Sequence, residues 1–314
     1  MCVAAASEYF MKSQSAGLAL ALALLLLLAP GISHAQTPTS CTISVFQAPP
    51  SGDPGSTFVN GINRWGNAVG FTFITELPFI RHPDGGIEVL PIHLSGFVDA
   101  IPSKRNAFGV TVGKIQDSQG HFHGFINSGT DTVLFSIPGA VDTFLTGINR
   151  HGTIVGNFNA ADGTIKSFKI KNGKTTMLQF RTNTQATSIS DTGVIVGNTI
   201  GTLPSQNEHG FVLMNGQFHD FDFPGANFTT IADINATGTI VGTFGTATGK
   251  GGGFIFKNGT FFVPTLRTAD GKVFSGSIDG INGFGAIAGT VGIIFPNDPS
   301  AGNGFLGFVG KCAP

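Results

Sequence analysis

Short apolar runs alternate with turn residues along most of the chain, as the segment GINRHGTIVGNF at 147–158 illustrates. The Asn149 side chain can bond the backbone two residues on, and Gly152 can supply the positive φ that a tight turn needs. Two apolar runs joined by such a turn predict a β-hairpin. The TIVG run is apolar at successive positions, which is typical of a strand covered on both faces. Within it, Gly156 lets a neighbouring backbone or a phenylalanine ring approach closely.

This hairpin pattern recurs six times when one isoleucine in each copy serves as the marker. The markers are Ile62, Ile101, Ile148, Ile189, Ile234 and Ile281, at spacings of 39, 47, 41, 45 and 47 residues. The second copy, AIPSKRNAFG, is degenerate and places Pro102 where the others have asparagine or serine. The turn and core positions predicted from the other copies are Asn63, Gly66, Asn149, Gly152, Gly156, Gly193, Gly197, Asn235, Gly238, Gly242, Asn282, Gly285 and Gly289.

Two further landmarks recur between the hairpins. One is a phenylalanine in a short β-prone run, at Phe79, Phe125, Phe168, Phe211, Phe254 and Phe308. The other is a strand that ends near proline, in LFSIPGAVDT at 134–143 and DFDFPGANFT at 220–229. Each unit therefore predicts four short strands.

Four strands in a unit of about 44 residues, covered on both faces, predict an all-β fold: a six-bladed β-propeller of four-stranded blades. A β-solenoid is the alternative, although its coils are usually much shorter, and a pair of β-sandwiches would not explain the regular period. We expect a single propeller domain over residues 36–314.

The two ends of the propeller segment predict how the ring closes. The run CTISVFQAP at 41–49 resembles the second strand of a unit, and GFLGFVGKC at 304–312 resembles the first. Joined, they resemble the internal hairpin GFIFKNGTFFVP at 253–264, with Cys41 and Cys312 in place of its turn. We therefore expect a last blade shared by both ends, closed by a Cys41–Cys312 disulfide with Cα atoms within ~7 Å.

The first 35 residues predict a cleaved signal peptide. Lys12 precedes an apolar run, AGLALALALLLLLAP, and Ser33 and Ala35 are the small residues of a cleavage site after Ala35. A retained anchor is the alternative, but the run of about 14 residues is shorter than the ~20 that span a bilayer. We expect a secreted or periplasmic monomer with no membrane span in its mature chain. The net charge of −1 and the charged fraction of 11% predict no nucleic-acid partner.

The segments HGFINSG…GINRHGTIVGNF and HGFVLMNGQF…DINATGTIVGTF resemble the bacterial extracellular HAF-repeat family. That family has a His-Ala-Phe triplet before a strand and a later I-N-x-x-G-x-[IV]-V-G segment. Here Gly124 and Gly210 replace the alanine. The resemblance implies export and a repetitive β fold, and it brings no established activity or catalytic residue.

Candidate chemistry is sparse. His121 and His123 share one face of a strand, but two ligands are too few for a structural zinc site, so we predict neither a metal nor a cofactor. Asp220 and Asp222 flank Phe221 and could act as acid and base, yet the other units do not repeat them. The acidic segments AADGT at 160–164 and TADGK at 268–272 lack the ligand spacing of a calcium loop and predict plain turns.

Trp65, the one tryptophan of the chain, lies in the first repeat turn. We predict that Trp65, His121, His123 and Asp220 are ligand contacts. Trp65, His121 and Asp220 break the repeat, whereas His123 shares its repeat position with His209. The sequence favours an exported, non-enzymatic binding or scaffold module acting on an extracellular or envelope ligand. The alternative is a hydrolase or lyase whose site is assembled from several blades at a channel mouth.

Overall fold

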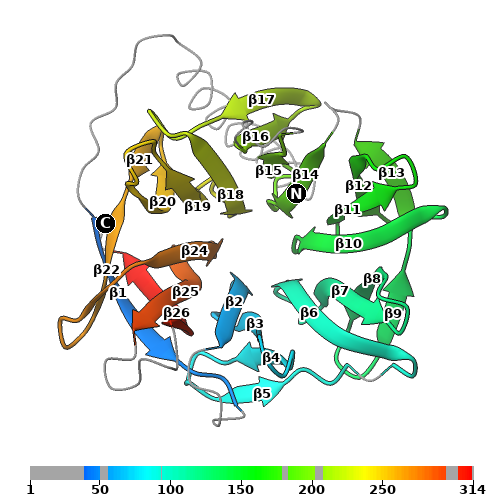
Figure 1. Cartoon of the computed structure of the whole chain (residues 1–314), viewed down its shortest axis with the longest axis horizontal. Helices are drawn as coiled ribbons and strands as arrows, with labels where there is room; N and C mark the ends of the chain where they lie inside the picture. The colour runs from blue at the N-terminus through cyan, green and yellow to red at the C-terminus, as the bar shows by residue number, and fades with distance from the viewer. Residues whose placement is uncertain are drawn as a thin grey trace, which may run out of the picture.

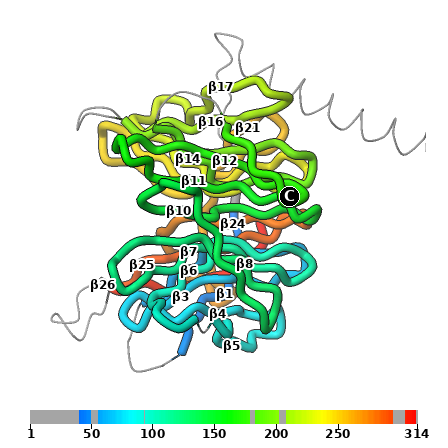
Figure 2. The backbone as a smooth tube through the Cα atoms, turned by 90° about the vertical axis from the view of Figure 1, so that its right-hand side faces the viewer, coloured from blue at the N-terminus to red at the C-terminus, as the bar shows by residue number. Residues whose placement is uncertain are grey.

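The computed structural model describes residues 39–49, 56–92, 94–178, 183–201, 208–294 and 303–312, so the predicted signal peptide lies outside the described residues. These residues form a six-bladed β-propeller (Figure 1). Figure 2 shows the ring edge-on, as a disc that is thinner than it is wide. The predicted fold is confirmed, and the solenoid and sandwich alternatives are wrong. Within the described ranges, no helix is long and apolar enough to cross a membrane.

Blades 1 to 5 are four-stranded antiparallel sheets whose strands follow in chain order from the axis outward (Figure 1). Blade 1 holds β2 (Thr57–Ile62), β3 (Ala68–Thr72), β4 (Pro78–Arg81) and β5 (Ile87–Val89), and blade 2 holds β6 (Phe97–Arg105), β7 (Thr111–Asp117), β8 (Phe122–Asn127) and β9 (Thr132–Phe135). Blade 3 holds β10 (Ala140–Ile148), β11 (Ile154–Ala160), β12 (Ile165–Lys171) and β13 (Lys174–Leu178). Blade 4 holds β14 (Thr184–Ile189), β15 (Ile195–Thr199), β16 (His209–Met214) and β17 (Gln217–Phe221), and blade 5 holds β18 (Phe228–Ile234), β19 (Ile240–Gly245), β20 (Gly251–Lys257) and β21 (Thr260–Phe262).

Blade 6 joins the two ends of the described chain, as predicted. It holds β24 (Gly276–Ile281), β25 (Ala286–Ile294), β26 (Asn303–Cys312) and β1 (Thr39–Phe46). Strands β1 and β26 are antiparallel, with Cys41 directly opposite Cys312. The two cysteines form a disulfide with Cα atoms 3.8 Å apart. The bridge therefore stands where the other blades have a hairpin turn.

One part of blade 6 was not predicted from the sequence. Strand β22 (Pro264–Thr268) pairs in parallel with β1, and β23 (Val273–Phe274) pairs with β22. The TADGK segment forms the turn between them, in which the Thr268 N–H donates to the carbonyl of Lys272. This extra hairpin covers the outer edge of β1, so the N-terminal strand has a neighbour on both sides.

Each blade is built around one phenylalanine and one glycine. The landmark phenylalanines Phe79, Phe125, Phe168, Phe211, Phe254 and Phe308 are among the largest fully buried side chains. In blade 3, Phe168 lies opposite Gly156 in the strand register. A Cβ atom on Gly156 would lie 2.7 Å from the ring of Phe168 and 2.3 Å from the carbonyl oxygen of Phe144. Only glycine leaves room for both, which explains why the repeat keeps it.

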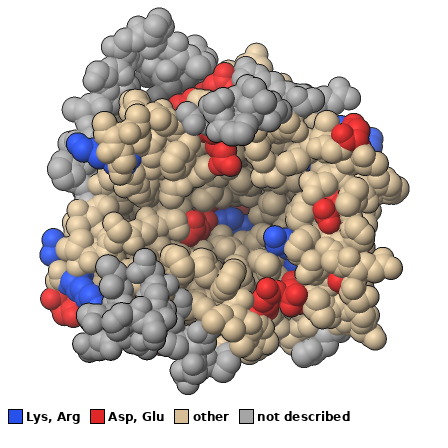
Figure 3. Space-filling model, viewed as in Figure 1, with Lys and Arg blue, Asp and Glu red and all other residues tan. Residues whose placement is uncertain are grey.

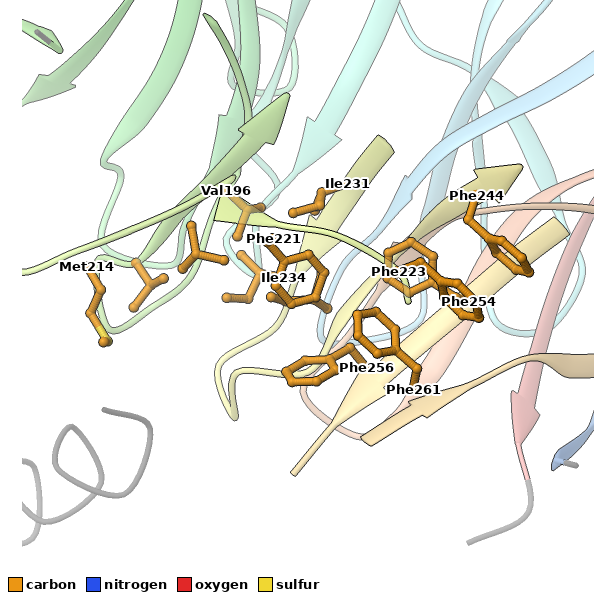
Figure 4. Close-up of a cluster of buried hydrophobic side chains, with 13 residues drawn as sticks. Val196, Met214, Phe221, Phe223, Ile231, Ile234, Phe244, Phe254, Phe256 and Phe261 are labelled. Carbon is orange, nitrogen blue, oxygen red and sulfur yellow. The ribbon is translucent and has the colours of Figure 1, made fainter. Parts of the chain in front are cut away.

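Aromatic side chains also join neighbouring blades. Figure 4 shows Phe221 and Phe223, at the end of blade 4, packed among the rings of blade 5. The ring centroids of Phe221 and Phe256 lie 5.0 Å apart, and those of Phe223 and Phe244 lie 3.7 Å apart. Burial of large apolar side chains, worth about 1.5–3 kcal/mol each, thus contributes to the blade contacts.

The predicted register of the second repeat was wrong. The turn of blade 2 begins at Asn106, whose Oδ1 accepts the N–H groups two and four residues on, as that of Asn149 does in blade 3. Ile101 and Pro102 lie earlier, inside β6. The turn residues are therefore Asn63, Asn106, Asn149, Ser190, Asn235 and Asn282, at spacings of 43, 43, 41, 45 and 47.

Candidate ligand-binding site

The turns that follow the inner strands β2, β6, β10, β14, β18 and β24 gather on one face of the disc, here named the turn face. The opposite face, which carries the connections between blades, is named the loop face. On the turn face, five of the six turns begin with an asparagine that reaches the next blade. Asn63 Nδ2, for example, donates to the carbonyl of Asn106 at 3.1 Å. Equivalent bonds come from Asn106, Asn149, Asn235 and Asn282. These bonds form the rim of the central channel, and they leave the asparagine side chains little capacity for a ligand.

Each inner strand has a β-bulge shortly before its end, at one shared repeat position. The residues that directly follow the bulges are Gly61, Lys104, Gly147, Ser188, Asp233 and Gly280. Three of them are glycine, and the inner strands come very close there: a Cβ on Gly61 would lie 2.7 Å from Cδ of Lys104. Gly61 therefore leaves room for the long side chain of Lys104 inside the channel, whereas Gly147 and Gly280 leave room for the inner strand of the next blade.

Lys104 and Asp233 form an ion pair across the channel. They belong to blades 2 and 5, which are opposite each other in the ring. Lys104 Nζ lies 3.0 Å from Asp233 Oδ2, and the two side chains are only 10% and 7% exposed. In the space-filling view, which shows the loop face, acidic and basic side chains lie at the bottom of the central hollow (Figure 3).

The hydrogen-bonding capacity of this pair is fully used. Lys104 Nζ also donates to the carbonyls of Asn60 at 3.0 Å and Asp279 at 2.9 Å, which accounts for its three N–H groups. The Asp233 carboxylate accepts from the Ser188 hydroxyl at 2.6 Å and from the N–H groups of Ile234 and Ile281. The pair therefore ties together strands from blades 1, 2, 4, 5 and 6, and it forms the floor of the turn-face mouth.

Above this floor lies an open cavity of about 580 Å³ whose rim carries exposed aromatic rings. Trp65, Phe108 and Phe284 occupy one turn position in blades 1, 2 and 6, and they are 60%, 79% and 60% exposed. The same turn position in blades 4 and 5 holds Thr192 and Thr237. The turn therefore does not require an aromatic residue, and the three rings form a continuous arc on neighbouring blades.

Arg64 and Arg150 also line this cavity. The Arg64 guanidinium is 5.6 Å from the centroid of the Trp65 ring and 5.3 Å from that of Phe284, and no ion pair is found for it among the described residues. Arg150 Nε lies 3.6 Å from Asp191 Oδ2. The Trp65 indole N–H donates to the carbonyl of Ala107 at 3.0 Å, which fixes its ring on the rim. The mouth thus combines flat apolar rings with fixed positive charge.

On the other side of the ion pair, Asp279 lines a second cavity, which opens at the loop-face ends of β2, β24 and β26. Withdrawal from bulk solvent raises the pKa of this carboxyl to about 6, although Ser277 donates to it at 2.6 Å. Asp279 stands at the bulged repeat position from which Asn60 and Thr146 donate to a carbonyl of the next blade. A protonated Asp279 carboxyl can donate a hydrogen bond at this position, whereas a carboxylate cannot.

Replacement of Asp279 by asparagine should stabilise the protein above pH 6. The pKa in the folded protein, about 6, lies above the ordinary value of 3.8, so the folded state retains a proton that the unfolded state has lost. The stability of the natural protein therefore falls as the pH rises from about 4 to about 6, by up to about 3 kcal/mol. Urea unfolding at pH 4 and pH 8 measures the effect. A matched variant at the exposed Asp131 should keep the natural pH dependence, and an unchanged pH dependence in Asp279→Asn would contradict the assignment.

The structure does not bring the four predicted ligand contacts together. Trp65 lies on the turn-face rim. His121 lies at the turn between β7 and β8, and His123 lies on β8. Asp220 lies on β17, the outermost strand of blade 4. Across the described ranges, no group of three or more His, Cys, Asp or Glu residues is arranged to hold a metal ion.

His123 and His209 share a repeat position, and each links the third strand of its blade to the end of the fourth. His123 Nδ1 lies 2.8 Å from the Ser136 hydroxyl, and its Nε2 lies 3.0 Å from Asp117 Oδ2. This hydrogen bond lowers the pKa of Asp117 to about 2. In blade 4, His209 Nδ1 lies 3.1 Å from the carboxylate of Asp222. Both histidines therefore have structural partners within their blades.

Sequence reasoning missed Lys104, Asp233 and Phe108, although the sequence holds a signal for Lys104 and for Phe108. If the copies are aligned on the N-x-x-G turn, SKRNAFG matches NGINRWG, and Lys104 falls opposite Gly61. The same alignment places Phe108 opposite Trp65. Because the second copy was aligned on Ile101, its register was shifted and neither match was seen.

Comparison with known proteins adds evidence on the fold. No protein-family model and no curated protein matches the chain. The putative TolB from Agrobacterium tumefaciens is similar in structure, with a TM-score of 0.53 at 11% identity over 76% of this chain and 97% of that protein. A gluconolactonase from Xanthomonas campestris gives 0.49 at 12% identity over 90% and 99%, and virginiamycin B lyase from Staphylococcus aureus gives 0.47 at 12% over 88% and 100%. At its low identity, the TolB similarity shows the propeller fold alone.

Proposed function

We propose that this protein is an exported, non-catalytic binding module that holds its ligand over the turn-face mouth. The observation that carries this proposal is the arc of Trp65, Phe108 and Phe284, three large rings exposed around one cavity. Exposed apolar groups that gather around a hollow are typical of interaction sites, and aromatic residues dominate the binding energy of such sites. The Lys104–Asp233 pair closes the channel below, so a ligand would lie on the mouth.

Two further observations support a binding role at this mouth. The charged groups of its floor are saturated by protein partners, which leaves neither Lys104 nor Asp233 available to transfer a proton. The disulfide between Cys41 and Cys312 is typical of proteins in oxidising compartments and supports a location in the periplasm or outside the cell.

The fluorescence of Trp65 offers a direct test, because the chain has one tryptophan. We would titrate the protein with neutral and acidic oligosaccharides and with short peptides, and follow the emission. A probe that binds the mouth should shift or quench it. In calorimetry, Trp65→Ala should then weaken binding of that probe at least tenfold, as expected for an aromatic residue worth about 2 kcal/mol.

The matched control is Phe73→Ala, because Phe73 is 62% exposed and follows β3 at its loop-face end. This variant should bind the probe as the natural protein does. Loss of binding in Phe73→Ala but not in Trp65→Ala would overturn the proposed site. Conversion of the probe during the titration would overturn the non-catalytic role.

A hydrolase or lyase is the second candidate, and one observation favours it. Asp279 has a pKa of about 6 and lines the cavity on the loop face, which suits a general acid or base near neutral pH. If this candidate is right, the protein should convert one of the probes. Asp279→Asn should abolish that turnover, and Trp65→Ala should retain it.

A further inference from the structure

The rim of the turn-face mouth continues outward into a second cavity, which lies between blades 5 and 6. This groove has a volume of about 590 Å³ and shares Asn235, Ile281, Gly283 and Phe284 with the central mouth. Its other described walls are the turn between β20 and β21, the turn between β18 and β19, and the end of β26. The ring of Phe284 therefore stands where the two cavities meet.

The charge of this combined surface is positive. Lys257 and Lys311 line the groove, both are exposed, and no acidic residue is among its described lining. The central mouth adds four basic residues, Arg64, Lys104, Arg105 and Arg150, against two acidic ones, Asp191 and Asp233. Since the whole chain carries a net charge of −1, this concentration of positive charge is local. A ligand that follows the groove from the mouth would thus meet a cation at each end of its path.

The shape and the lining of the surface favour a saccharide over a peptide. The rings of Trp65 and Phe284 lie open on turn tips, as flat platforms, whereas a peptide anchor usually enters a deep pocket or pairs with a strand edge. The groove walls come from turns and a strand end, and they offer the hydroxyl and amide groups of the exposed side chains of Thr237 and Asn258, while Thr239 is buried. Such groups match the hydroxyls of a sugar chain.

We propose that the ligand is an acidic oligosaccharide that stacks on Trp65 and Phe284 and runs along the groove to Lys257 and Lys311. This inference rests on the proposed function. Arg64, held between the two rings, would bind a carboxylate of the sugar at the mouth. The two lysines would bind the carboxylates of sugars farther along the chain.

The test uses four probes with the disulfide-intact protein: tetragalacturonate, galacturonic acid, the neutral tetrasaccharide of galactose, and a hexaglutamate peptide. Trp65 emission and calorimetry report binding. Tetragalacturonate should bind at least tenfold more tightly than the neutral tetrasaccharide, and its affinity should fall as sodium chloride is raised, because exposed charges are screened.

Lys257→Ala/Lys311→Ala should weaken tetragalacturonate binding about tenfold and leave the binding of galacturonic acid unchanged, because a single sugar does not reach the groove. The matched control is Lys171→Ala/Lys174→Ala, which removes the same charge from the K-N-G hairpin of blade 3. It should leave both affinities unchanged. Both double variants change exposed side chains, so their melting temperatures should equal that of the natural protein.

Other outcomes separate this inference from the proposed function. Equal affinity for the neutral and the acidic tetrasaccharide would overturn the acidic ligand and leave the binding module intact. Tighter binding of hexaglutamate, lost in the Lys257/Lys311 variant, would overturn the saccharide in favour of an acidic peptide. If none of the four probes changes the Trp65 emission, the inference is wrong, and the wider probe panel then decides the proposed function separately.

Discussion

Loss of the Cys41–Cys312 disulfide should lower the melting temperature of the protein by roughly 10 °C. The bridge closes a loop with a sequence separation of 271 residues, so it removes much conformational freedom from the unfolded chain. On a loop-closure argument, the bridge contributes up to about 5 kcal/mol to the free energy of unfolding. The variant to measure is Cys41→Ala/Cys312→Ala, because alanine places no polar atom at the fully buried Cys41 position.

The disulfide also has a local role that a stability measurement alone does not reveal. In the other blades, a hairpin turn joins the third strand to the fourth, but β26 and β1 come from opposite ends of the described chain. Without the covalent link, β1 is held by its ladders with β26 and β22 and by the burial of Ile43 in the core. We therefore expect hydrogen exchange in the variant to accelerate in β1 and β22 before it accelerates in blades 2 to 4.

A reductant provides the control for this prediction. It should lower the melting temperature of the natural protein and leave that of the double variant unchanged, since the variant has no bond to reduce. A decrease of less than about 2 °C in both experiments would show that the strand ladders alone close the ring.

The sequence predicted the blades well because each blade is specified by local signals. The N-x-x-G turn, the phenylalanine of the third strand and the glycine opposite it all lie within one repeat. Gly156 and Phe168 illustrate this, since their contact explains both residues and lies within a single sheet. The shared last blade was also predictable, because both of its half-hairpins resemble an intact one elsewhere in the chain.

The register of blade 2 was not predictable from isoleucine spacing, because Arg105 replaces the marker isoleucine just before the turn. The turn chemistry of Asn106 was the more reliable guide, since its side chain makes the hydrogen bonds that define the turn. The hairpin of β22 and β23 has no counterpart in the other units, so the repeat contained no information about it.

The site was harder to predict than the fold, because its residues meet only when the ring closes. Lys104 and Asp233 are separated by about half the ring, and neither has a local motif. What identifies them is their repeat position, where three of the other four blades have glycine. The rim was partly predictable, because Trp65 was recognised as an exposed departure from the repeat, whereas its association with Arg64 and Phe284 depends on three dimensions.

Replacement of Lys104 by methionine should destabilise the protein by about 3–5 kcal/mol. Methionine has a similar length but leaves the Asp233 carboxylate buried without its cation, while Ser188 and the N–H groups of Ile234 and Ile281 still bond it. Two carbonyls, of Asn60 and Asp279, also lose a donor. Urea unfolding at pH 7 measures the loss.

The double variant Lys104→Met/Asp233→Asn separates the loss of the pair from the loss of a side chain. Asparagine is neutral and keeps an oxygen that can accept the surrounding hydrogen bonds, so no unpaired charge remains buried. We expect the double variant to be more stable than Lys104→Met by at least 1–2 kcal/mol, because residues in direct contact are coupled in a double-mutant cycle.

Acid provides a second readout that a merely steric effect of methionine would not produce. The Lys104 ammonium lowers the pKa of Asp279, so this pKa should rise above about 6 in Lys104→Met, and the deficit relative to the natural protein should shrink as the pH is lowered from 7 to 4. Lys104→Met/Asp233→Asn also lacks Lys104 and keeps Asp279, so it should show the same pH dependence. A deficit that is independent of pH, together with additive losses in the single variants Lys104→Met and Asp233→Asn, would show that the floor of the mouth is held by packing and not by the charge of the pair.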